Sequence, residues 1–500
     1  MNAGEFQSAA SSNNKPHAKA AFLDLLDSKI KVSAITNSHP DTARLRNGDP
    51  FPFVIAIIPA YNEQDSILKT LKSLKTQTRP PDEIIVLADN CTDDTIPLVI
   101  AAGVTIVESR DNADGKAGAL NQLLDQILPI LFGSDVILVM DADTALTTDF
   151  IQESVNVLFS DSKKKIAGVG GIFLGDDSEG WNLVKQLQSN EYVRYQRRLS
   201  RRRGRALVLT GTGTVFKVET LLAVKTARTN GRLPDFGHSE SVYDLSALTE
   251  DNELTISVKE LGYRVVSPKN CTVGTAMMPD IKSLYKQRRR WQRGALENII
   301  AHRVNLHTLP YLLRQLLTYI GVLFLPFYLY TLTIALITQS SINFLQPLWV
   351  AVAVVYVLEQ SFSVRKGGKK AVLISLLILP EILLNMFLNL IYVATLYGAL
   401  FATNESWGRM RHLQQMPLTE QDQSTETVVK PVTLHGTHKI RHTSKARGIE
   451  LILVLLTLVP VYFGIVIPLV DLQLAWNVIA VYVLTGFAAT ILRLIPVKTF

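Results

Sequence analysis

One stretch of the chain, Val136 to Asp143, most constrains what the sequence can fold into. Its apolar residues Val136 to Met140 have the pattern of a buried strand, and two carboxylates, Asp141 and Asp143, follow it directly. In an open α/β sheet, ligands bind beyond the carboxyl ends of the strands, so these carboxylates are expected to face a ligand. Their spacing suits the binding of one Mg²⁺ or Mn²⁺ ion, and phosphate oxygens would complete the coordination of that ion. A strand followed by a helix cap is the competing interpretation, because aspartate also favours turns and caps.

Three similar units precede that stretch. Apolar strand patterns over 54–58, 83–87 and 104–108 are each followed by a polar loop and a helical pattern. Acids or amides lie at the strand ends. The alternation predicts a doubly wound, mostly parallel sheet with a crevice of nucleotide size.

The loops after these strands resemble the motifs of family 2 glycosyltransferases of the GT-A fold. In chain order, the matching stretches are residues 59–63 (Pro-Ala-Tyr-Asn-Glu), 89–93 (Asp-Asn-Cys-Thr-Asp), 115–121, 141–143, 210–214, 249–251 and 287–291. All seven occur in family order over residues 53–291, which makes the set specific. The branch that the chain is most similar to is the membrane-embedded polysaccharide synthases, among them the hyaluronan, chitin, cellulose and poly-N-acetylglucosamine enzymes.

The resemblance implies an inverting, metal-dependent transfer from a UDP-sugar, such as UDP-GlcNAc or UDP-glucose, to a growing β-linked polysaccharide. The donor residues that it implies are Ala60, Tyr61, Glu63, Asp89, Lys116, Asp141, Gln287 and Arg290. Asp143 is the implied ligand of Mn²⁺ or Mg²⁺. The implied acceptor residues are Gly211, Thr212, Gly213, Glu250 and Trp291.

Asp251 is the expected catalytic base, because inverting transfer needs a carboxylate that deprotonates the acceptor hydroxyl. The residues alone also fit a helix N-terminus at 249–253. Both roles can coexist if Thr249 caps the helix and leaves Asp251 free. Trp291 has an alternative as a membrane-interface aromatic, and the glycines of 210–214 have one as a simple turn.

The apolar residues, 47% of the chain by the broad definition, gather in long blocks beyond about residue 305. We therefore expect an α/β GT-A catalytic domain fused to an α-helical transmembrane domain. The expected parts are a largely disordered segment (1–50), the cytosolic catalytic domain (51–291), an amphipathic interface helix (292–308), a membrane region (309–402), a cytosolic loop with an insert (403–448) and a last membrane region (449–495).

Within the membrane regions, the expected spans are 311–338, 346–363, 450–470 and 474–494, with an interfacial or re-entrant helix at 371–401. The basic residues of 365–370 place the catalytic domain on the cytoplasmic side by the positive-inside rule. We expect no span before the catalytic domain, which departs from the synthases and leaves fewer helices for a secretion channel.

Trp407 and Arg409 lie where the hyaluronan-type synthases carry a gating loop. Only Trp-Gly-Arg of 407–409 matches, so an interfacial tryptophan beside basic anchors is the equal alternative. A gating loop would close over the bound donor and exclude water.

The net charge of +7 is interpreted as membrane-facing rather than as a sign of nucleic acid. Seven arginines fall within 194–205, but without a nucleic-acid recognition fold a solvated or headgroup-facing helix is favoured. The expected partners are a UDP-sugar donor, a glycan or lipid acceptor and membrane lipids. The alternatives are a non-processive enzyme that modifies a lipid carrier or protein, and a catalytically silent polysaccharide-binding or export component.

Overall fold

The computed structural model describes residues 45–46, 49–50, 52–160, 165–175, 182–234, 241–322 and 347–400. The chain divides into two compact units. The first unit runs to Lys286 and includes Ser363–Leu373, and the second holds Gln287–Phe362 and the chain from Ile374.

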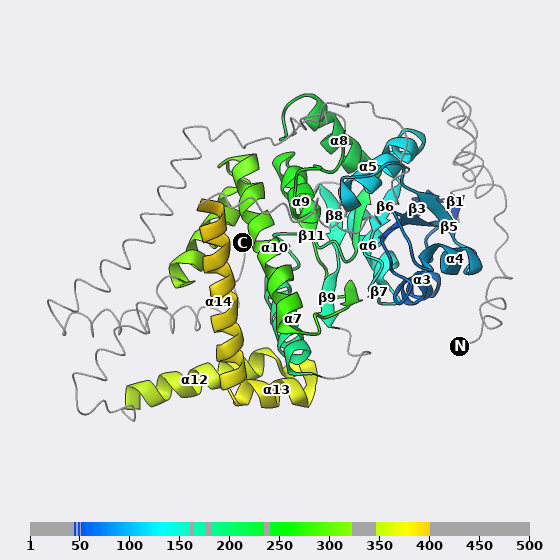
Figure 1. Cartoon of the computed structure of the whole chain (residues 1–500). Coiled ribbons are helices and arrows are strands. Elements are labelled where there is room, and N and C mark those ends of the chain that lie inside the picture. Colours follow the sequence, from blue (N-terminus) through cyan, green and yellow to red (C-terminus); the bar gives the residue numbers. More distant parts are fainter. Residues whose placement is uncertain are drawn as a thin grey trace, which may run out of the picture. The chain divides into compact units, whose positions relative to one another are not determined.

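The first unit is built on a seven-stranded sheet (Figure 1). Its strands lie in the order β11 (Arg264–Val266), β8 (Ile166–Gly170), β10 (Thr214–Lys217), β6 (Val136–Val139), β3 (Val54–Ala60), β4 (Glu83–Ala88) and β5 (Thr105–Glu108). Within this sheet only β10 runs antiparallel to its neighbours. The mostly parallel α/β sheet predicted from the sequence is confirmed, and β3 to β6 match the four predicted strands closely.

A second, three-stranded sheet has the order β7 (Thr144–Leu146), β12 (Thr272–Thr275) and β9 (Ile172–Gly175). The sequence pattern did not predict it. The residues after Asp143 were considered as a turn or cap, but Thr144–Leu146 instead pairs antiparallel with β12. Asp149 is the residue that precedes the next helix, α6 (Phe150–Phe159).

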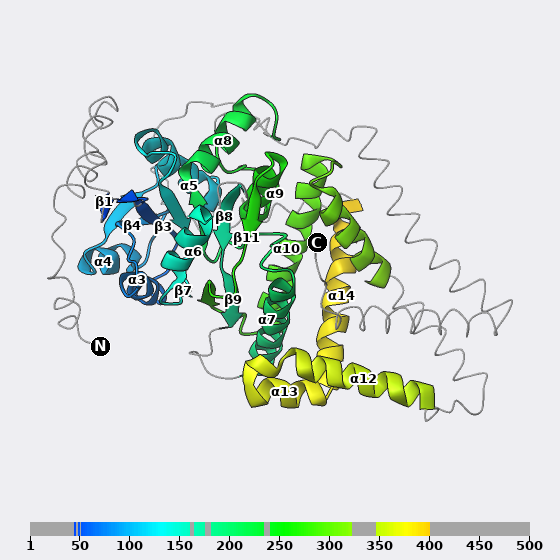
Figure 2. The same cartoon turned by 180° about the vertical axis from the view of Figure 1, so that it is seen from behind.

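Helices cover both faces of the main sheet (Figure 2). Their bounds are α3 (Ile67–Lys75), α4 (Thr95–Ala101), α5 (Gly115–Ile127), α8 (Val218–Thr229) and α9 (Glu250–Glu260), with a short 3-10 turn at Leu128–Ile130. Ile55 and Ile57 of β3 belong to the core that contains α5, α8 and α9. Val54 and Ile58 belong to the core that contains α3 and α6. Burial on both faces explains the continuous apolar run of β3, since neither face meets water.

Helix α7 (Leu183–Arg201) carries most of the predicted arginine cluster. Asn182 caps it, accepting a hydrogen bond from the Lys185 amide at 2.8 Å. Arg194 donates to Ser363 Oγ at 3.0 Å within the first unit. Arg194 of the predicted solvated or headgroup-facing helix therefore makes a hydrogen bond with another part of the protein.

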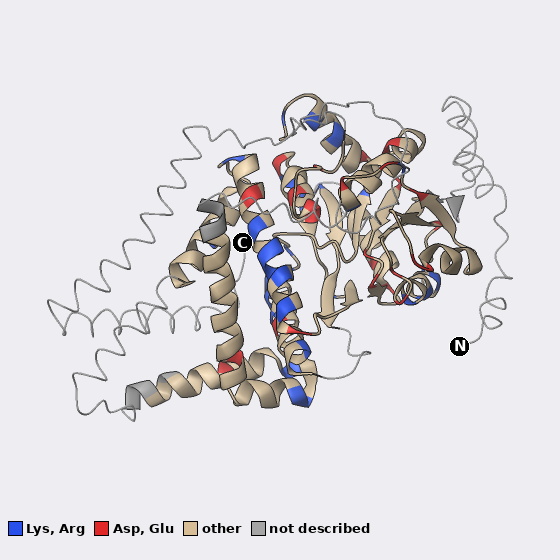
Figure 3. Ribbon diagram, in the orientation of Figure 1, with Lys and Arg blue, Asp and Glu red and all other residues tan. Residues whose placement is uncertain are grey.

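The described part of the second unit is helical. Its elements are α10 (Ile281–His302), which starts in the first unit, a helix over 309–322, α12 (Pro347–Ser363) and α14 (Leu379–Leu400), while α13 (Gly368–Leu376) lies across the division. Basic positions follow one another along α10, drawn blue in Figure 3.

Two predicted helix boundaries differ from the structure. The helix expected at 292–308 is part of α10, which begins at Ile281 and ends at His302. It ends there because Arg303 has a φ of 59° and the Asn305 side chain accepts from the following amides. The single helix expected at 371–401 is two helices, broken before α14 where Ile378 has a φ of 56°.

Leu379–Leu396 is long and apolar enough to cross a membrane, and within the described ranges it is the one such segment. α12 covers the predicted span 346–363, and whether it crosses a membrane stays a prediction. The expected spans 450–470 and 474–494, the segment 403–448 and most of 1–50 lie outside the described residues.

Candidate active site

Three of the predicted motif loops meet at one edge of the main sheet. β3 is parallel to both β4 and β6, with Ala60 paired to Ala88 and Ile57 paired to Val139. The carboxyl ends of parallel strands lie at the same edge, so the loops that follow these strands come together there. The loops hold the predicted residues Ala60, Tyr61, Glu63, Asp89, Asp141 and Asp143.

Helix α3 fixes the backbone between the two aspartates that follow β6. Thr70 Oγ1 of α3 donates to the carbonyl oxygen of Ala142 at 2.6 Å, and Thr70 is fully buried. A buried hydrogen bond of this kind restrains the loop, because breaking it would leave a carbonyl unpaired. Asp141 and Asp143 are therefore held on either side of a fixed point.

Lys116 links three elements of the site. Its Nζ lies 2.6 Å from Asp141 Oδ1 and 3.2 Å from Glu250 Oε1, which joins α5, the β6 loop and α9. Burial opposes the lysine charge, but the carboxylates of Asp141 and Glu250 outweigh it and raise the pKa of Lys116. The stretch 115–121, expected as a loop, forms the first turns of α5, and Gly115 begins the helix with a φ of 59°.

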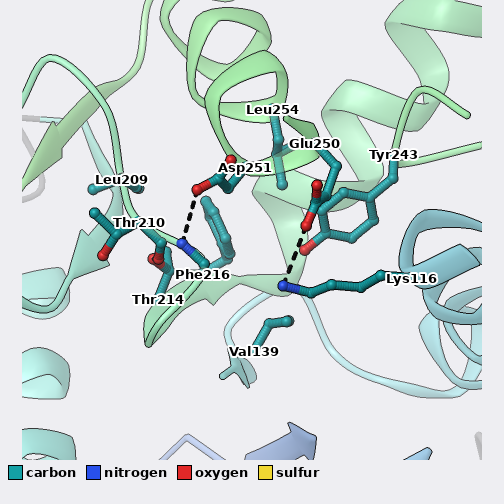
Figure 4. Close-up of a pocket in the computed structure, with 11 residues that line it drawn as sticks. Lys116, Val139, Leu209, Thr210, Thr214, Phe216, Tyr243, Glu250, Asp251 and Leu254 are labelled. Atoms are coloured by element: carbon teal, nitrogen blue, oxygen red, sulfur yellow. Dashed lines mark hydrogen bonds and ion pairs between the residues drawn. The ribbon is translucent and has the colours of Figure 1, made fainter. Parts of the chain in front are cut away.

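A pocket lies beside this ion pair (Figure 4). Its lining residues are Lys116, Val139, Leu209, Thr210, Gly211, Thr214, Phe216, Tyr243, Glu250, Asp251 and Leu254. The close-up shows Lys116 facing Glu250 and Tyr243, with Asp251 turned toward the loop that contains Thr210. The mixture of apolar walls with a few convergent polar groups is typical of small-molecule sites.

Asp251 is held by two backbone amides. Its Oδ2 accepts from the Gly211 amide at 2.9 Å, and its Oδ1 accepts from the Asn252 amide at 2.8 Å. Burial raises the pKa of Asp251 to about 6, with Glu250 adding to the shift and Lys116 opposing it. A carboxylate with such a pKa is mostly ionised at neutral pH and able to accept a proton.

The sequence pattern predicts that Thr249 caps α9 and leaves Asp251 free. Thr249 is the N-cap residue, but its side chain makes no capping hydrogen bond. Asp251 instead uses its own carboxylate on the neighbouring amides. The carboxylate thereby ties α9 to the predicted acceptor loop, a contact between residues 40 positions apart in the chain.

The carboxylates of Glu63, Asp141 and Asp143 repel one another. Burial, together with the negative charges of Asp141 and Glu63, raises the pKa of Asp143 to about 6. Burial also raises the pKa of Glu63, against the hydrogen bond that its Oε2 accepts from Ser66 at 2.7 Å. This corner of the site has an excess of negative charge around Asp143.

The chemistry of this corner fits a hard divalent cation. Within the described residues, no group of three or more His, Cys, Asp or Glu side chains is arranged to hold a metal by itself. Mg²⁺ sites commonly need only one or two carboxylates, because substrate phosphates and waters supply the other ligands. Asp143 meets that requirement, because its carboxylate oxygens can ligate a cation and the charges that act on it come from the acids Asp141 and Glu63.

Asp89 occupies a different environment. It is only 4% exposed, and its Oδ1 accepts from Ser109 Oγ at 2.6 Å, Asn112 Nδ2 at 2.8 Å and Asn90 Nδ2 at 3.0 Å. The role of Ser109 was not foreseen. Its place immediately after β5 is the signal that could have identified it, because polar residues at this edge share the site.

The two predicted acceptor glycines face different surroundings. A Cβ added at Gly211 would lie 3.1 Å from Lys116 Nζ and 3.6 Å from an oxygen of Asp251, so this glycine borders the charged groups. A Cβ at Gly213 would instead meet Leu146 at 3.2 Å and Val273 at 3.3 Å. Gly213 thus admits close packing between the sheets. Thr212 lies between the two glycines in the chain, and its hydroxyl oxygen is 2.9 Å from the hydroxyl oxygen of Thr210.

Gln287, Arg290 and Trp291 lie on α10, in the part that belongs to the second unit. The Arg288 guanidinium lies over the Trp291 ring, 4.5 Å from its centroid. Their donor and acceptor roles stay predictions. Trp407 and Arg409 lie outside the described residues, so the gating loop is a prediction as well.

Known proteins resemble part of this chain. The family model described as glycosyltransferase-like family 2 matches residues 51–294. The poly-beta-1,6-N-acetyl-D-glucosamine synthase of Staphylococcus aureus is 24% identical over 268 residues, which cover 53% of this chain and 58% of that protein. The protein named probable glycosyltransferase YdaM of Bacillus subtilis is 28% identical over 257 residues, covering 50% of this chain and 56% of that protein.

The matched region thus spans less than two thirds of the length of these curated relatives. Among solved structures, a mannosyltransferase of Pyrobaculum calidifontis in complex with GDP-Man and Mn²⁺ is 17% identical, with a TM-score of 0.46, over 77% of this chain and 97% of that one. The family match, the ordered motifs and the observed sheet agree. Residues 51–294 match the family model described as glycosyltransferase-like family 2, and this part of the chain is a glycosyltransferase domain.

Proposed function

We propose that this chain transfers a sugar from a UDP-sugar, with UDP-GlcNAc or UDP-glucose as the first candidates, to a hydroxyl group of a growing β-linked polysaccharide. The anomeric configuration inverts, Asp251 removes the proton of the acceptor hydroxyl, and UDP leaves. The enzyme is anchored in a membrane, with the catalytic unit in the cytoplasm.

The observation that carries this proposal is the position of Asp251. Its carboxylate lines the pocket, and the Gly211 amide at 2.9 Å fixes it there. Lys116, 2.6 Å from Asp141 and 3.2 Å from Glu250, balances the neighbouring charges and keeps an ionised base possible in a partly buried site. A base needs both a fixed direction and a pKa below the working pH, and Asp251 has both.

Donor binding is assigned to the loops that follow β3, β4 and β6. Asp89 and the backbone at Tyr61 would hold the uridine, and Asp143 would hold the divalent cation with Asp141 beside it. When bound, Mn²⁺ or Mg²⁺ would neutralise the charge that grows on the diphosphate as the glycosidic bond breaks. The crowding of Glu63, Asp141 and Asp143 supports this assignment, since a cation would relieve their repulsion.

Membrane attachment is supported by the second unit. α14 exposes large apolar side chains, Leu379, Leu383 and Leu390, each more than half accessible. Contiguous apolar exposure of this kind marks a surface that meets lipid or another protein. The basic positions of α10 would favour the negatively charged cytoplasmic leaflet.

The deciding experiment measures UDP release by the full chain purified in detergent, with Mn²⁺ or Mg²⁺, against a panel of UDP-sugars. We expect release with one donor and a product of high molecular weight on a gel. Release with a short or lipid-extractable product would refute polysaccharide synthesis and establish a non-processive transferase. No release with any donor would refute catalysis and support a silent binding or export component.

A further inference from the structure

Tyr243 lies in the candidate active site although no motif contains it. It lines the pocket together with Lys116, Glu250 and Asp251, and Figure 4 shows its ring next to Lys116 and Glu250. Only 4% of the residue is exposed. Tyr243 therefore contributes a wall to the pocket rather than to the outer surface.

The backbone of Tyr243 is clamped from α5. Asn121 Nδ2 donates to the Tyr243 carbonyl oxygen at 2.8 Å, and the Tyr243 amide donates to Asn121 Oδ1 at 2.9 Å. α5 also carries Lys116. A paired, buried hydrogen bond of this kind fixes both the position and the direction of the residue relative to the ion pair.

The preceding residue is fixed as well. Arg228 Nε donates to the Val242 carbonyl oxygen at 3.4 Å, and its guanidinium forms a fully buried ion pair with Glu253 at 2.6 Å. Glu253 belongs to α9, the helix of Asp251. Tyr243 is thus held directly by α5, which carries Lys116, and its neighbour Val242 is tied through Arg228 of α8 to α9, which carries the proposed base.

The phenolic hydroxyl is the exception in this network. Both hydrogen bonds that Tyr243 makes with the described residues use its backbone, and its hydroxyl has no partner there. The hydroxyl oxygen itself is not fully buried, so it stays accessible to a ligand that enters the pocket. Burial raises the pKa of Tyr243, so the group stays protonated and able to donate at neutral pH.

The missing partner fits the chemistry of a sugar. The pocket combines apolar side chains, among them Val139, Phe216 and Leu254, with charged groups. A pyranose has an apolar face and a rim of oxygens, so it can pack against the former while its oxygens meet polar groups. A hydroxyl or amide oxygen of such a ring is a suitable partner for a fixed phenol.

We propose that Tyr243 is a substrate-binding and specificity-determining residue, whose phenolic hydroxyl forms a hydrogen bond with one oxygen substituent of the sugar in this pocket. The inference rests on the proposed function, because it needs a sugar substrate. It adds a contact that selects for the presence of one substituent. Sites built to bind a substrate hydroxyl reject analogues without it, since the protein group is then left unpaired.

The test compares the full chain with its Tyr243→Phe variant, which removes one oxygen and keeps the ring. UDP release is measured with the natural donor and with donor analogues that each lack one hydroxyl or amide, and then with acceptors that lack single hydroxyls. We expect kcat/KM for the natural substrate to fall by about 5- to 10-fold in the variant, the size of one neutral hydrogen bond. One analogue should be discriminated by the original chain and not by the variant.

The group missing from that analogue is the substituent that Tyr243 contacts. If the analogue is one of the sugar donor, Tyr243 contacts the donor sugar, and if it is one of the acceptor, Tyr243 contacts the acceptor sugar. The ratio of rates for two substrates does not depend on the fraction of folded enzyme, so partial unfolding cannot imitate this result. Tyr192→Phe is the matched control. Tyr192 is 3% exposed on α7, outside the pocket lining, with its ring edge-on to Phe173, and its loss of a phenolic oxygen should leave discrimination unchanged.

Two results would overturn the inference in distinguishable ways. In the first, the original chain is active, and the Tyr243→Phe variant discriminates against every analogue as strongly as the original chain does. That result would refute the role of Tyr243 and leave the proposed function standing. No UDP release by the original chain with any donor would refute the proposed function, and the assignment of Tyr243 to a sugar would fall with it.

Discussion

The two sides of the candidate site treat their carboxylates in opposite ways. On the β4 and β5 side, Asp89 is buried and accepts hydrogen bonds from Ser109, Asn112 and Asn90. On the β6 and α9 side, burial and neighbouring acids raise the pKa values of Asp143 and Asp251 to about 6. On the first side three polar side chains hold one oxygen of the carboxylate, whereas the second side carries negative charge that the protein only partly balances.

This difference indicates a division of labour. A carboxylate held by several hydrogen bonds from polar side chains is rigid before any ligand arrives, as suits the recognition of a constant group such as a nucleoside. Carboxylates kept close to one another in a partly buried site cost stability, and such costs are typical of groups that take part in the reaction. If this division holds, substitutions on the β6 and α9 side should affect turnover, and those on the β4 and β5 side should affect binding and stability.

The largest effect is expected at Asp251. Asp251→Asn should lower kcat by about 10³-fold, because the amide can accept the Gly211 hydrogen bond but cannot accept a proton. UDP binding should be unchanged. The thermal midpoint should change little, because the loss of the hydrogen bond from the Asn252 amide opposes the gain from removing a charge that burial disfavours.

Kinetics, UDP titration and thermal unfolding of the same preparation check this prediction. Asp125→Asn is the control, because Asp125 is a half-exposed carboxylate on α5 that pairs with Lys225 away from the pocket. Normal turnover by Asp251→Asn would remove Asp251 as the base. It would also remove the reason to separate the two sides of the site.

Metal removal is expected to have the next largest effect. Chelation of divalent cations should lower UDP release by about 10²-fold or more, because the leaving diphosphate would lose its counter-charge. Asp143→Asn should raise the Mn²⁺ concentration needed for half-maximal activity. It should also stabilise the metal-free protein by about 1 kcal/mol, since a repelled carboxylate is removed and solvent screening limits the gain.

A titration of UDP release with Mn²⁺ and a thermal unfolding series without metal measure these two changes. Full activity in the presence of chelator would contradict the assignment of Asp143. The two measurements together separate metal binding from a structural role. If Asp143 were purely structural, Asp143→Asn would destabilise the metal-free protein rather than stabilise it.

Much of this site could be predicted from the sequence because its donor side follows simple patterns. The strands β3, β4 and β6 are apolar runs that end in polar residues, and a parallel sheet places those ends together. The sequence therefore sufficed to place Asp89, Asp141 and Asp143 at one edge.

The other half of the fold escaped prediction for physical reasons. β8 contains Gly168 and Gly170, where added Cβ atoms would come within 2.8 Å of Leu209, so packing requires residues with low strand propensity. β7 has three residues and pairs with β12, far away in the chain. Periodicity reports local structure and cannot identify such pairings.

Tyr243 was missed for a related reason. Its importance depends on Asn121, which is 122 positions away, and on the buried pair of Arg228 with Glu253. None of these residues has a local pattern that distinguishes it from an ordinary core residue. Long-range polar contacts appear only when the chain is folded.

The dependence of activity on pH is expected to be smaller and to reveal which acids must be ionised. kcat/KM should fall about tenfold per pH unit below about pH 6, because Asp251 must be deprotonated in the free enzyme. At limiting Mn²⁺ the decline should be steeper, since protonation of Asp143 also opposes metal binding. At saturating Mn²⁺, kcat/KM should again fall only about tenfold per pH unit, because the protonation of Asp251 alone then limits activity.

Stability should change with pH in the opposite direction. A carboxyl whose pKa is raised on folding stabilises the protein fully below its unfolded value of about 4, and this contribution is lost as pH rises through about 6. Thermal unfolding of the metal-free protein at pH 4 to 7 measures it. An activity profile that is flat between pH 5 and 7 would contradict the ionisation requirement on the β6 and α9 side.

The smallest effect on turnover is expected on the β4 and β5 side, where Asn112→Ala provides the counter-test. Asn112 Nδ2 donates to Asp89 Oδ1 and to the Gly115 carbonyl oxygen, each at 2.8 Å. Its removal should lower the free energy of unfolding by about 1 to 2 kcal/mol and weaken UDP binding several-fold, because Asp89 would keep only part of its support. kcat should change by less than about twofold, since no proton or leaving-group charge is handled there.

Asn156→Ala, which removes an exposed amide paired with Gln152 on α6, should change none of these quantities. Denaturant unfolding, UDP titration and kcat at saturating donor separate stability, binding and turnover. A large fall in kcat for Asn112→Ala would show that the rigid side also shapes the transition state, and the division between the two sides would then have to be abandoned. An unchanged kcat with weaker UDP binding would locate recognition at Asp89, because the same chain would then show opposite responses to the loss of Asn112 and the loss of the Asp251 carboxylate.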